Sequence, residues 1–195
     1  MKERYLNLAT GLIFSSLAAT ALVIVLFFLP TTSEFFEFNK FTAFLALTII
    51  TLIAWAVKML VDGRFTITTT PISLPLIILL ATTAVATITS IDPYHSLDRL
   101  LVTMTIIVFY FLTVANLKSR KRVEIIIFTL IGATTLASTV ALFSYFGIFL
   151  PFEFATIHSF NPLGLVSRLA LLQALVLPLS ISLAIFSKNQ KVSLT

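Results

Sequence analysis

The chain has 195 residues, of which 58% are hydrophobic and only 11% are charged, and its mean hydropathy is +1.08. Soluble domains are closer to 45–50% apolar and about 25% charged, so this composition excludes a soluble globular protein and indicates an integral membrane protein. The absence of cysteine excludes disulfides and thiolate metal sites. The net charge of +5 is explained by basic cytoplasmic loops, so we predict no nucleic-acid partner.

Six long apolar runs follow one another along the chain. A helix needs about 20 apolar residues to cross the hydrocarbon core of a bilayer, and the runs lack the alternation that is typical of membrane barrel strands. The sequence therefore predicts an all-α, polytopic membrane helix bundle with about six transmembrane helices, in a single transmembrane domain over residues 1–195. The predicted spans are Leu8–Leu29, Phe41–Val61, Ile72–Thr89, Leu97–Ala115, Val123–Leu150 and Leu163–Phe186.

Two of these runs have unusual lengths. The first run follows the charged segment Met1–Tyr5, but its 22 residues exceed the 7–15 residues of a cleaved signal peptide, so we predict an uncleaved first span. The fifth run is too long for a simple perpendicular span. We expect it either to tilt or to end in the membrane interface.

The distribution of lysine and arginine predicts the orientation of the chain. With the N-terminus in the cytoplasm, ten of the 13 basic residues fall on the cytoplasmic side, and only Lys40, Arg99 and Arg168 fall outside. The opposite topology would break the positive-inside rule, so we predict that both termini are cytoplasmic. The ten are Lys2, Arg4, Lys58, Arg64, Lys118, Arg120, Lys121, Arg122, Lys188 and Lys191.

Local signals predict helix ends and helix contacts. Asp92 followed by Pro93 is typical of an N-cap with proline at the first helical position. Pro178 lies inside the sixth run, where we expect a kink. Ala133, Ala137 and Ala141 recur every four residues in the fifth run, which predicts close helix packing along that face.

The most polar stretch between two apolar runs covers residues 88–101. It contains the residue types of a hydrolase triad in Asp92, His95, Ser96 and Asp98, but their spacing within seven residues does not bring nucleophile, base and orienting acid into line. Helix capping accounts for them better. The predicted external polar cluster consists of Asp92, Tyr94, His95 and Asp98 from this stretch and Asn161 from a later loop. The chain has no recognisable metal-ligand or nucleotide-binding motif, so we predict no metal and no cofactor.

Arg99 and Arg168 each lie in the first turns of a predicted helix that starts on the external side. The helix dipole disfavours a cation there, and a guanidinium near hydrocarbon needs a partner. For Arg99, the partner is either Asp92 or another external acid, or else a bound anion such as phosphate. Arg168 has no acid closer in sequence than Glu153, so it either extends to the interface or binds an anion.

Three pieces of the sequence together resemble a known family. They are residues 29–40 (LPTTSEFFEFNK), residues 89–97 (TSIDPYHSL) and residues 160–164 (FNPLG), the last leading into an apolar helix that contains Leu177-Pro178-Leu179. In this combination they are similar to the N-terminal half of bacterial O-antigen ligase/polymerase-type membrane proteins. The second piece resembles the family most closely, and the resemblance covers most of the chain.

The resemblance implies a glycosyltransferase of polysaccharide biosynthesis for the cell envelope. It would transfer a glycan from a polyprenyl-diphosphate carrier at the external face of the cytoplasmic (inner) membrane of a bacterium. The implied partners are membrane lipid and the polyprenyl-diphosphate-linked glycan, with no cofactor. Arg99 and Arg168 would bind the carrier diphosphate, whereas the catalytic residues stay unknown. Family members have about twice as many spans and a large external loop, so we expect residues 1–195 to be the N-terminal part of a longer architecture, inactive alone.

Two other classes of protein stay open. One is a transporter or channel subunit that works as a dimer, and the other is a non-catalytic membrane scaffold. A transporter should carry charges in the middle of its spans, whereas here the charges cluster at the ends of the runs. For the enzyme, we expect the segments Asp92–Arg99 and Asn161–Arg168 to lie at the same external face.

Overall fold

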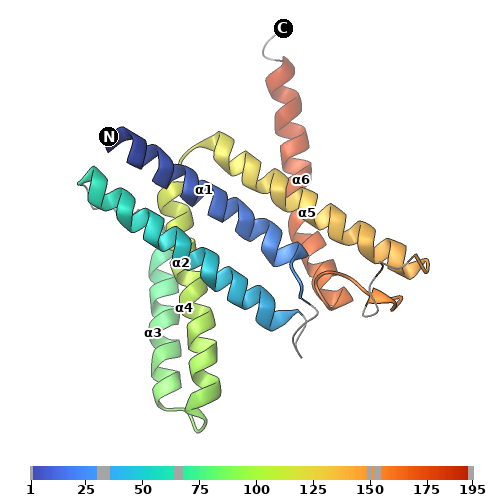
Figure 1. Cartoon of the computed structure of the whole chain (residues 1–195), viewed down its shortest axis with the longest axis horizontal. Helices are drawn as coiled ribbons and strands as arrows, with labels where there is room; N and C mark the ends of the chain where they lie inside the picture. Colours follow the sequence, from blue (N-terminus) through green and yellow to red (C-terminus); the bar gives the residue numbers. More distant parts are fainter. Residues whose placement is uncertain (1, 30–35, 64–67, 149–150, 152–154, 193–195) are drawn as a thin grey trace. The chain divides into compact units, whose positions relative to one another are not determined.

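The computed structural model describes residues 2–29, 36–63, 68–148, 151 and 155–192, and its regular structure is entirely α-helical over these residues. The helices are α1 (Lys2–Leu26), α2 (Glu37–Asp62), α3 (Ser73–Ile88), α4 (Pro93–Asn116), α5 (Arg120–Tyr145) and α6 (Val166–Val192) (Figure 1). The prediction of an all-α fold with six apolar helices is confirmed.

All of these helices except α3 are long and apolar enough to cross a membrane, which makes the chain a multi-pass membrane protein. Helix α3 is equally apolar but has only 16 residues. It is therefore about 24 Å long, shorter than the roughly 30 Å of hydrocarbon in a typical bilayer. The cytoplasmic placement of both termini stays a prediction.

The end of α5 differs from the end of the predicted fifth span. The run Val123–Leu150 was predicted as a span that either tilts or ends in the membrane interface, and the helix ends at Tyr145. The backbone N–H groups of Gly147 and Ile148 donate to carbonyls three and five residues earlier, at 3.1 and 2.9 Å, in a Schellman motif. Gly147 has a φ of +78°, which a residue without Cβ adopts readily. The helix therefore stops at this glycine, and residues 149–150 lie outside the described part of the chain.

The starts of α1 and α6 also differ from the predicted spans. Helix α1 begins at Lys2, well before the predicted Leu8, because charged residues such as lysine and glutamate extend a helix beyond its apolar part. Helix α6 begins at Val166 and not at Leu163, because the preceding residues form a turn that is described below.

The chain divides into two compact units, and α1 and α2 each contribute one part to each unit. Unit 1 comprises Met1–Leu17 and Phe44–Arg122, and unit 2 comprises Ala18–Ala43 and Val123–Thr195. The prediction of a single domain over the whole chain stays a prediction.

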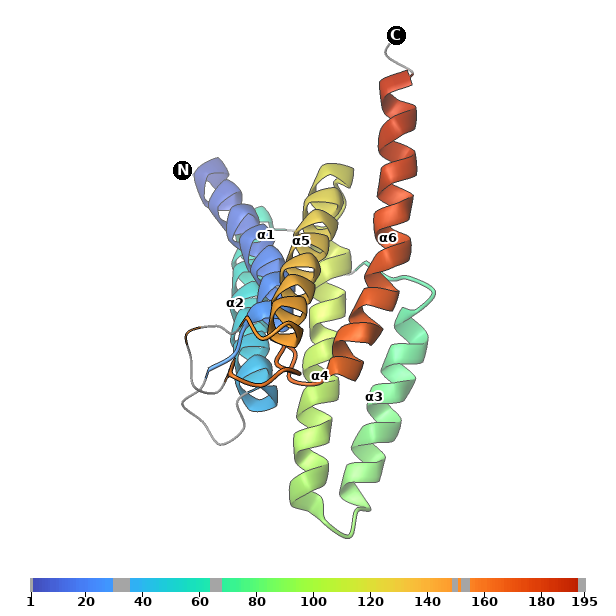
Figure 2. The ribbon, with the colours of Figure 1, turned by 90° about the vertical axis from the view of Figure 1, so that its right-hand side faces the viewer.

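In unit 1, α3 and α4 form an antiparallel pair that lies side by side in both ribbon views (Figures 1 and 2). The part of α1 in this unit contacts α2 through a buried hydrogen bond between the hydroxyls of Ser16 and Thr51, 2.7 Å long. Helix α2 contacts α4 through the rings of Phe44 and Phe109, whose centroids are 5.1 Å apart. These contacts hold the four helices of the unit together.

In unit 2, the core forms around the small residues of α5. Ala133 and Ala137 are buried against Val25 of α1 and Leu169 of α6, and Ala141 packs at the edge of this cluster. The prediction that the alanine stripe packs closely against other helices is therefore confirmed. Helix α6 continues through Pro178, as the sequence placed it, while the expected kink stays a prediction.

Candidate functional site

The polar turn between α3 and α4 is organised by Asp92. Its carboxylate accepts hydrogen bonds from the backbone N–H groups of Tyr94 and His95, at 3.2 and 3.3 Å, and Pro93 occupies the first helical position. The predicted N-cap is thus confirmed. The carboxylate also contacts Nδ1 of His95 at 2.9 Å. The hydrogen bond from the His95 backbone, together with the imidazole and the Tyr94 amide, holds the pKa of Asp92 below its usual value.

The same turn does not assemble a hydrolase triad. The Ser96 hydroxyl donates to the Ser90 hydroxyl at 2.6 Å, and the Ser90 hydroxyl donates to the backbone carbonyl of Asp92 at 3.1 Å. A nucleophilic serine would have to donate to the histidine that acts as its base. The arrangement is therefore a capped helix start, as the spacing in the sequence indicated.

The remaining predicted residues of this turn are exposed on α4. Tyr94, Asp98 and Arg99 are all exposed, and Arg99 forms no ion pair with any residue that the structure describes. Asp92, which was considered as the partner of Arg99, contacts His95 instead. The structure thus leaves the guanidinium of Arg99 open to solvent or to an external anion.

The second predicted segment, around Asn161, is a tight turn in unit 2. The buried side chain of Asn161 accepts a hydrogen bond from the N–H of Leu163 at 3.0 Å, and its backbone carbonyl accepts one from Gly164 at 3.0 Å. Gly164 has a φ of +87°, and a Cβ at this position would lie 2.9 Å from the ring of Phe36. Only glycine fits here without strain, so the turn is fixed against the segment that leads into α2.

Lys40 of α2 connects to this turn. Its ammonium group donates to the carbonyl of Pro162 at 2.7 Å and to the carbonyl of Val25 at 3.4 Å. The side chain is half-buried, and the neighbouring Asn39 donates to the carbonyl of Leu29 at 3.1 Å. The start of α2 is therefore joined to the end of α1 and to the loop before α6 by side-chain hydrogen bonds to backbone carbonyls.

Arg168 has an acidic partner that lies far away in sequence. Its guanidinium forms an ion pair with the carboxylate of Glu37 in the first turn of α2. Lys40 lies one turn after Glu37 on α2 and adds a second cation to this region. We call Glu37, Lys40, Asn161, Pro162 and Arg168 the α2–α6 site.

Among the residues that the structure describes, the α2–α6 site combines two cationic side chains with one carboxylate. The ammonium of Lys40 has three donors and the guanidinium of Arg168 has five, more than Glu37 and the two carbonyls can accept. The side chains of Arg168 and Glu37 are 42% and 64% exposed, so the surplus donors are accessible. Chemically, the arrangement can bind an anion with several oxygen atoms.

The predicted site residues fall in two units. Arg168 and Asn161 lie in the α2–α6 site, while Asp92, His95 and Arg99 belong to the other unit, so a common face for the two groups stays a prediction. Sequence reasoning missed Glu37 and Lys40 as site residues. A signal for Lys40 existed, because it is one of only three basic residues on the predicted external side.

No cluster of three or more metal-ligating side chains occurs among the residues that the structure describes. A comparison of the chain with models of protein families, with curated proteins and with solved structures gives no match.

Proposed function

We propose that this chain is part of a membrane glycosyltransferase of the O-antigen ligase/polymerase type, in which the α2–α6 site binds the diphosphate of a polyprenyl-diphosphate-linked glycan. The observation that carries the proposal is the placement of two cationic side chains, Lys40 and Arg168, beside the carboxylate of Glu37 among the residues that the structure describes. An anionic ligand would balance the second cation.

The chemistry of the two side chains suits a diphosphate. A guanidinium presents its donors as a planar fork that matches phosphate oxygens, whereas an ammonium acts as a point charge. Arg168 lies in the first turn of α6, where unpaired backbone N–H groups also favour negative charge. The long apolar helices on which the site is built provide a lipid-facing surface for the polyprenyl chain.

The proposal is tested by measuring the binding of three synthetic ligands to the purified chain in detergent. The ligands share one short polyprenyl chain and end in a diphosphate, a monophosphate or an alcohol. We expect affinity to fall in that order, because each phosphate removed takes away charge-assisted hydrogen bonds. Equal affinity for the diphosphate and the alcohol would show that only the apolar chain is bound, and it would refute an anion site.

Two substitutions locate the binding site. Arg168→Lys keeps the charge but loses the fork, and we expect diphosphate affinity to fall roughly tenfold to a hundredfold, as for the loss of one charge-assisted hydrogen bond. Glu37→Gln removes the competing carboxylate and should tighten binding. The matched control is Arg4→Lys, an exposed arginine near the start of α1. Unchanged affinity in a folded Arg168→Lys variant would end the diphosphate proposal at this site.

A further inference from the structure

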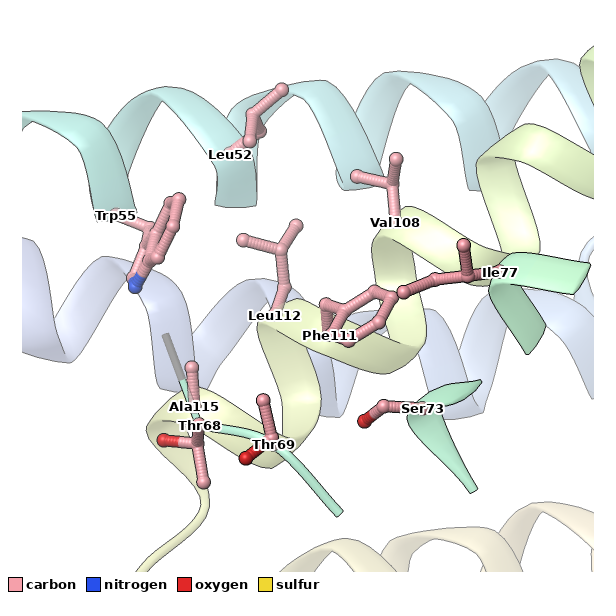
Figure 3. A pocket seen from close by; sticks show the side chains of 10 residues that line it. All are labelled: Leu52, Trp55, Thr68, Thr69, Ser73, Ile77, Val108, Phe111, Leu112 and Ala115. Atoms are coloured by element: carbon pink, nitrogen blue, oxygen red, sulfur yellow. The ribbon is translucent and has the colours of Figure 1, made fainter. Parts of the chain in front are cut away.

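Unit 1 contains an apolar pocket that the proposed function does not use. The pocket has a volume of about 380 Å³ and is lined by α2, by the segment before α3, by α3 and by α4. This volume is within the roughly 300–1,000 Å³ that is typical of ligand sites. Figure 3 shows the side chains of Trp55, Leu112, Phe111 and Ile77 around the hollow, with the hydroxyls of Thr68, Thr69 and Ser73 along one side.

One wall of the pocket is a face of α4. Val108, Phe111, Leu112 and Ala115 line it and recur at the spacing of one helix face. From Val108 to Ala115 this face runs about 10 Å. An apolar wall of this length on a membrane-spanning helix suits a hydrocarbon chain better than a compact polar ligand.

A cationic side chain lies at one end of the pocket. Ala115 is followed directly by Asn116, whose amide oxygen accepts a hydrogen bond from the ammonium of Lys58 at 3.2 Å. Lys58 lies one turn beyond Trp55, so this contact sits where the pocket ends on both α2 and α4.

Two further cations follow closely in the chain. Lys118 and Arg122 come two and six residues after Asn116, the partner of Lys58, and Asp62 lies one turn after Lys58 on α2. We call Lys58, Lys118 and Arg122 the basic cluster. Arg122 is held in place over the ring of Phe14, 5.8 Å from the ring centroid.

We propose that this pocket and the basic cluster together form a binding site for one anionic phospholipid, with an acyl chain in the pocket and the phosphate against the cluster. The charge complementarity commits the site to an anionic headgroup. The cluster lies on the predicted cytoplasmic side, where anionic lipids attract basic side chains near the membrane surface.

The chain offers its own optical probe for this site, since Trp55 is the single tryptophan of the sequence and lines the pocket. The full chain is reconstituted in phosphatidylcholine vesicles that contain either phosphatidylglycerol or phosphatidylcholine with brominated acyl chains. We expect the brominated phosphatidylglycerol to quench Trp55 fluorescence more strongly at the same mole fraction. High salt should reduce this preference, because it screens the charges. Equal quenching by both lipids in the wild-type protein would overturn the proposal.

Three variants show whether the preference arises in the basic cluster. Lys58→Gln and Lys118→Gln should each lower the preference for phosphatidylglycerol by roughly tenfold, as for the loss of one charge-assisted contact to the phosphate. Lys118 is exposed, so its variant keeps the test valid if Lys58→Gln fails to fold. Lys121→Gln, an exposed charge outside the basic cluster, should leave the preference unchanged. An equal loss in all three variants would indicate a diffuse surface charge and contradict a defined site.

Discussion

The turn between α3 and α4 and the α2–α6 site contain similar residues but are built in opposite ways. In the turn, Asp92 and His95 are three positions apart and both are exposed, and the carboxylate of Asp92 contacts the imidazole of His95. In the α2–α6 site, Glu37 and Arg168 are 131 positions apart, and the half-buried Lys40 adds a second cation. The polar cluster that is local in sequence is satisfied by capping a helix, whereas the one assembled from distant segments combines two cations with one carboxylate among the described residues.

This contrast predicts that substitutions in the α2–α6 site affect a whole unit, while those in the turn act locally. The largest effect is expected for Gly164→Ala. The left-handed backbone costs an alanine about 1–2 kcal/mol, and moving the ring of Phe36 costs about 1–3 kcal/mol more. Thermal unfolding in micelles, followed by circular dichroism, measures the combined loss.

The control for Gly164→Ala is Gly63→Ala, because Gly63 also has a positive φ but has nothing within 4 Å of the added Cβ. A similar loss in both variants would show that Phe36 moves at no cost.

The next largest effect is expected for Lys40→Met, which keeps the apolar stem but removes the ammonium. The carbonyl of Pro162 then loses its donor, and a buried acceptor without a partner costs about 1–3 kcal/mol. Unfolding should occur at lower temperature, and hydrogen exchange at the backbone amides of Leu163 and Gly164 should become faster. Lys121→Met, at an exposed position of α5, should change neither measurement. Unchanged exchange in the Lys40 variant would mean that the turn does not depend on this contact.

A smaller and local effect is expected for Asp92→Ala. The backbone N–H groups of Tyr94 and His95 lose their acceptor, so hydrogen exchange at these two amides should accelerate. The unfolding transition of the whole chain should stay where it is, because the cap is exposed. Asp98→Ala, which removes an exposed carboxylate from the same helix, is the matched control. If Asp92→Ala shifted the global transition, the turn would not be the self-contained element described here.

The smallest effect is expected when the pH is lowered. The folded pKa of Asp92 is lowered, chiefly by the hydrogen bond from the backbone of His95, so the carboxylate favours the folded turn when it is ionised. This contribution is present above the unfolded pKa of aspartate, about 3.9, and is lost as the pH falls through the lower folded value. Protection of the Tyr94 and His95 amides should therefore decrease only at strongly acidic pH, and an Asp92→Asn variant should show no such step.

The number and order of the helices could be predicted, because long apolar runs mark them in a membrane protein. The N-cap at Asp92 and the packing of Ala133 and Ala137 were also accessible, since both depend on residues a few positions apart. The end of α5 could not be predicted from the sequence, because apolar residues continue past Tyr145 and the helix stops only at the backbone turn of Gly147.

The candidate site was harder to predict for a different reason. Arg168 was singled out from the sequence because no acid is near it in the chain, yet its partner Glu37 comes from the start of α2. Lys40 was counted only as a charge on the external side. Periodicity and local spacing carry no information on which helix starts meet, so contacts between the first and last thirds of the chain could not be derived from them.

The core of unit 2 also determines when contacts of α1 can form during synthesis of the chain. Val25 packs against Ala133 and Ala137, which the ribosome adds more than a hundred residues later. At about 5–20 residues per second, the final turns of α1 and the start of α2 wait roughly 5–20 s for their partners. During that interval the ammonium of Lys40 lacks the carbonyl of Pro162 and the carboxylate of Glu37 lacks Arg168. Slowing of synthesis between α2 and α5 therefore lengthens the time that these charges spend without their partners.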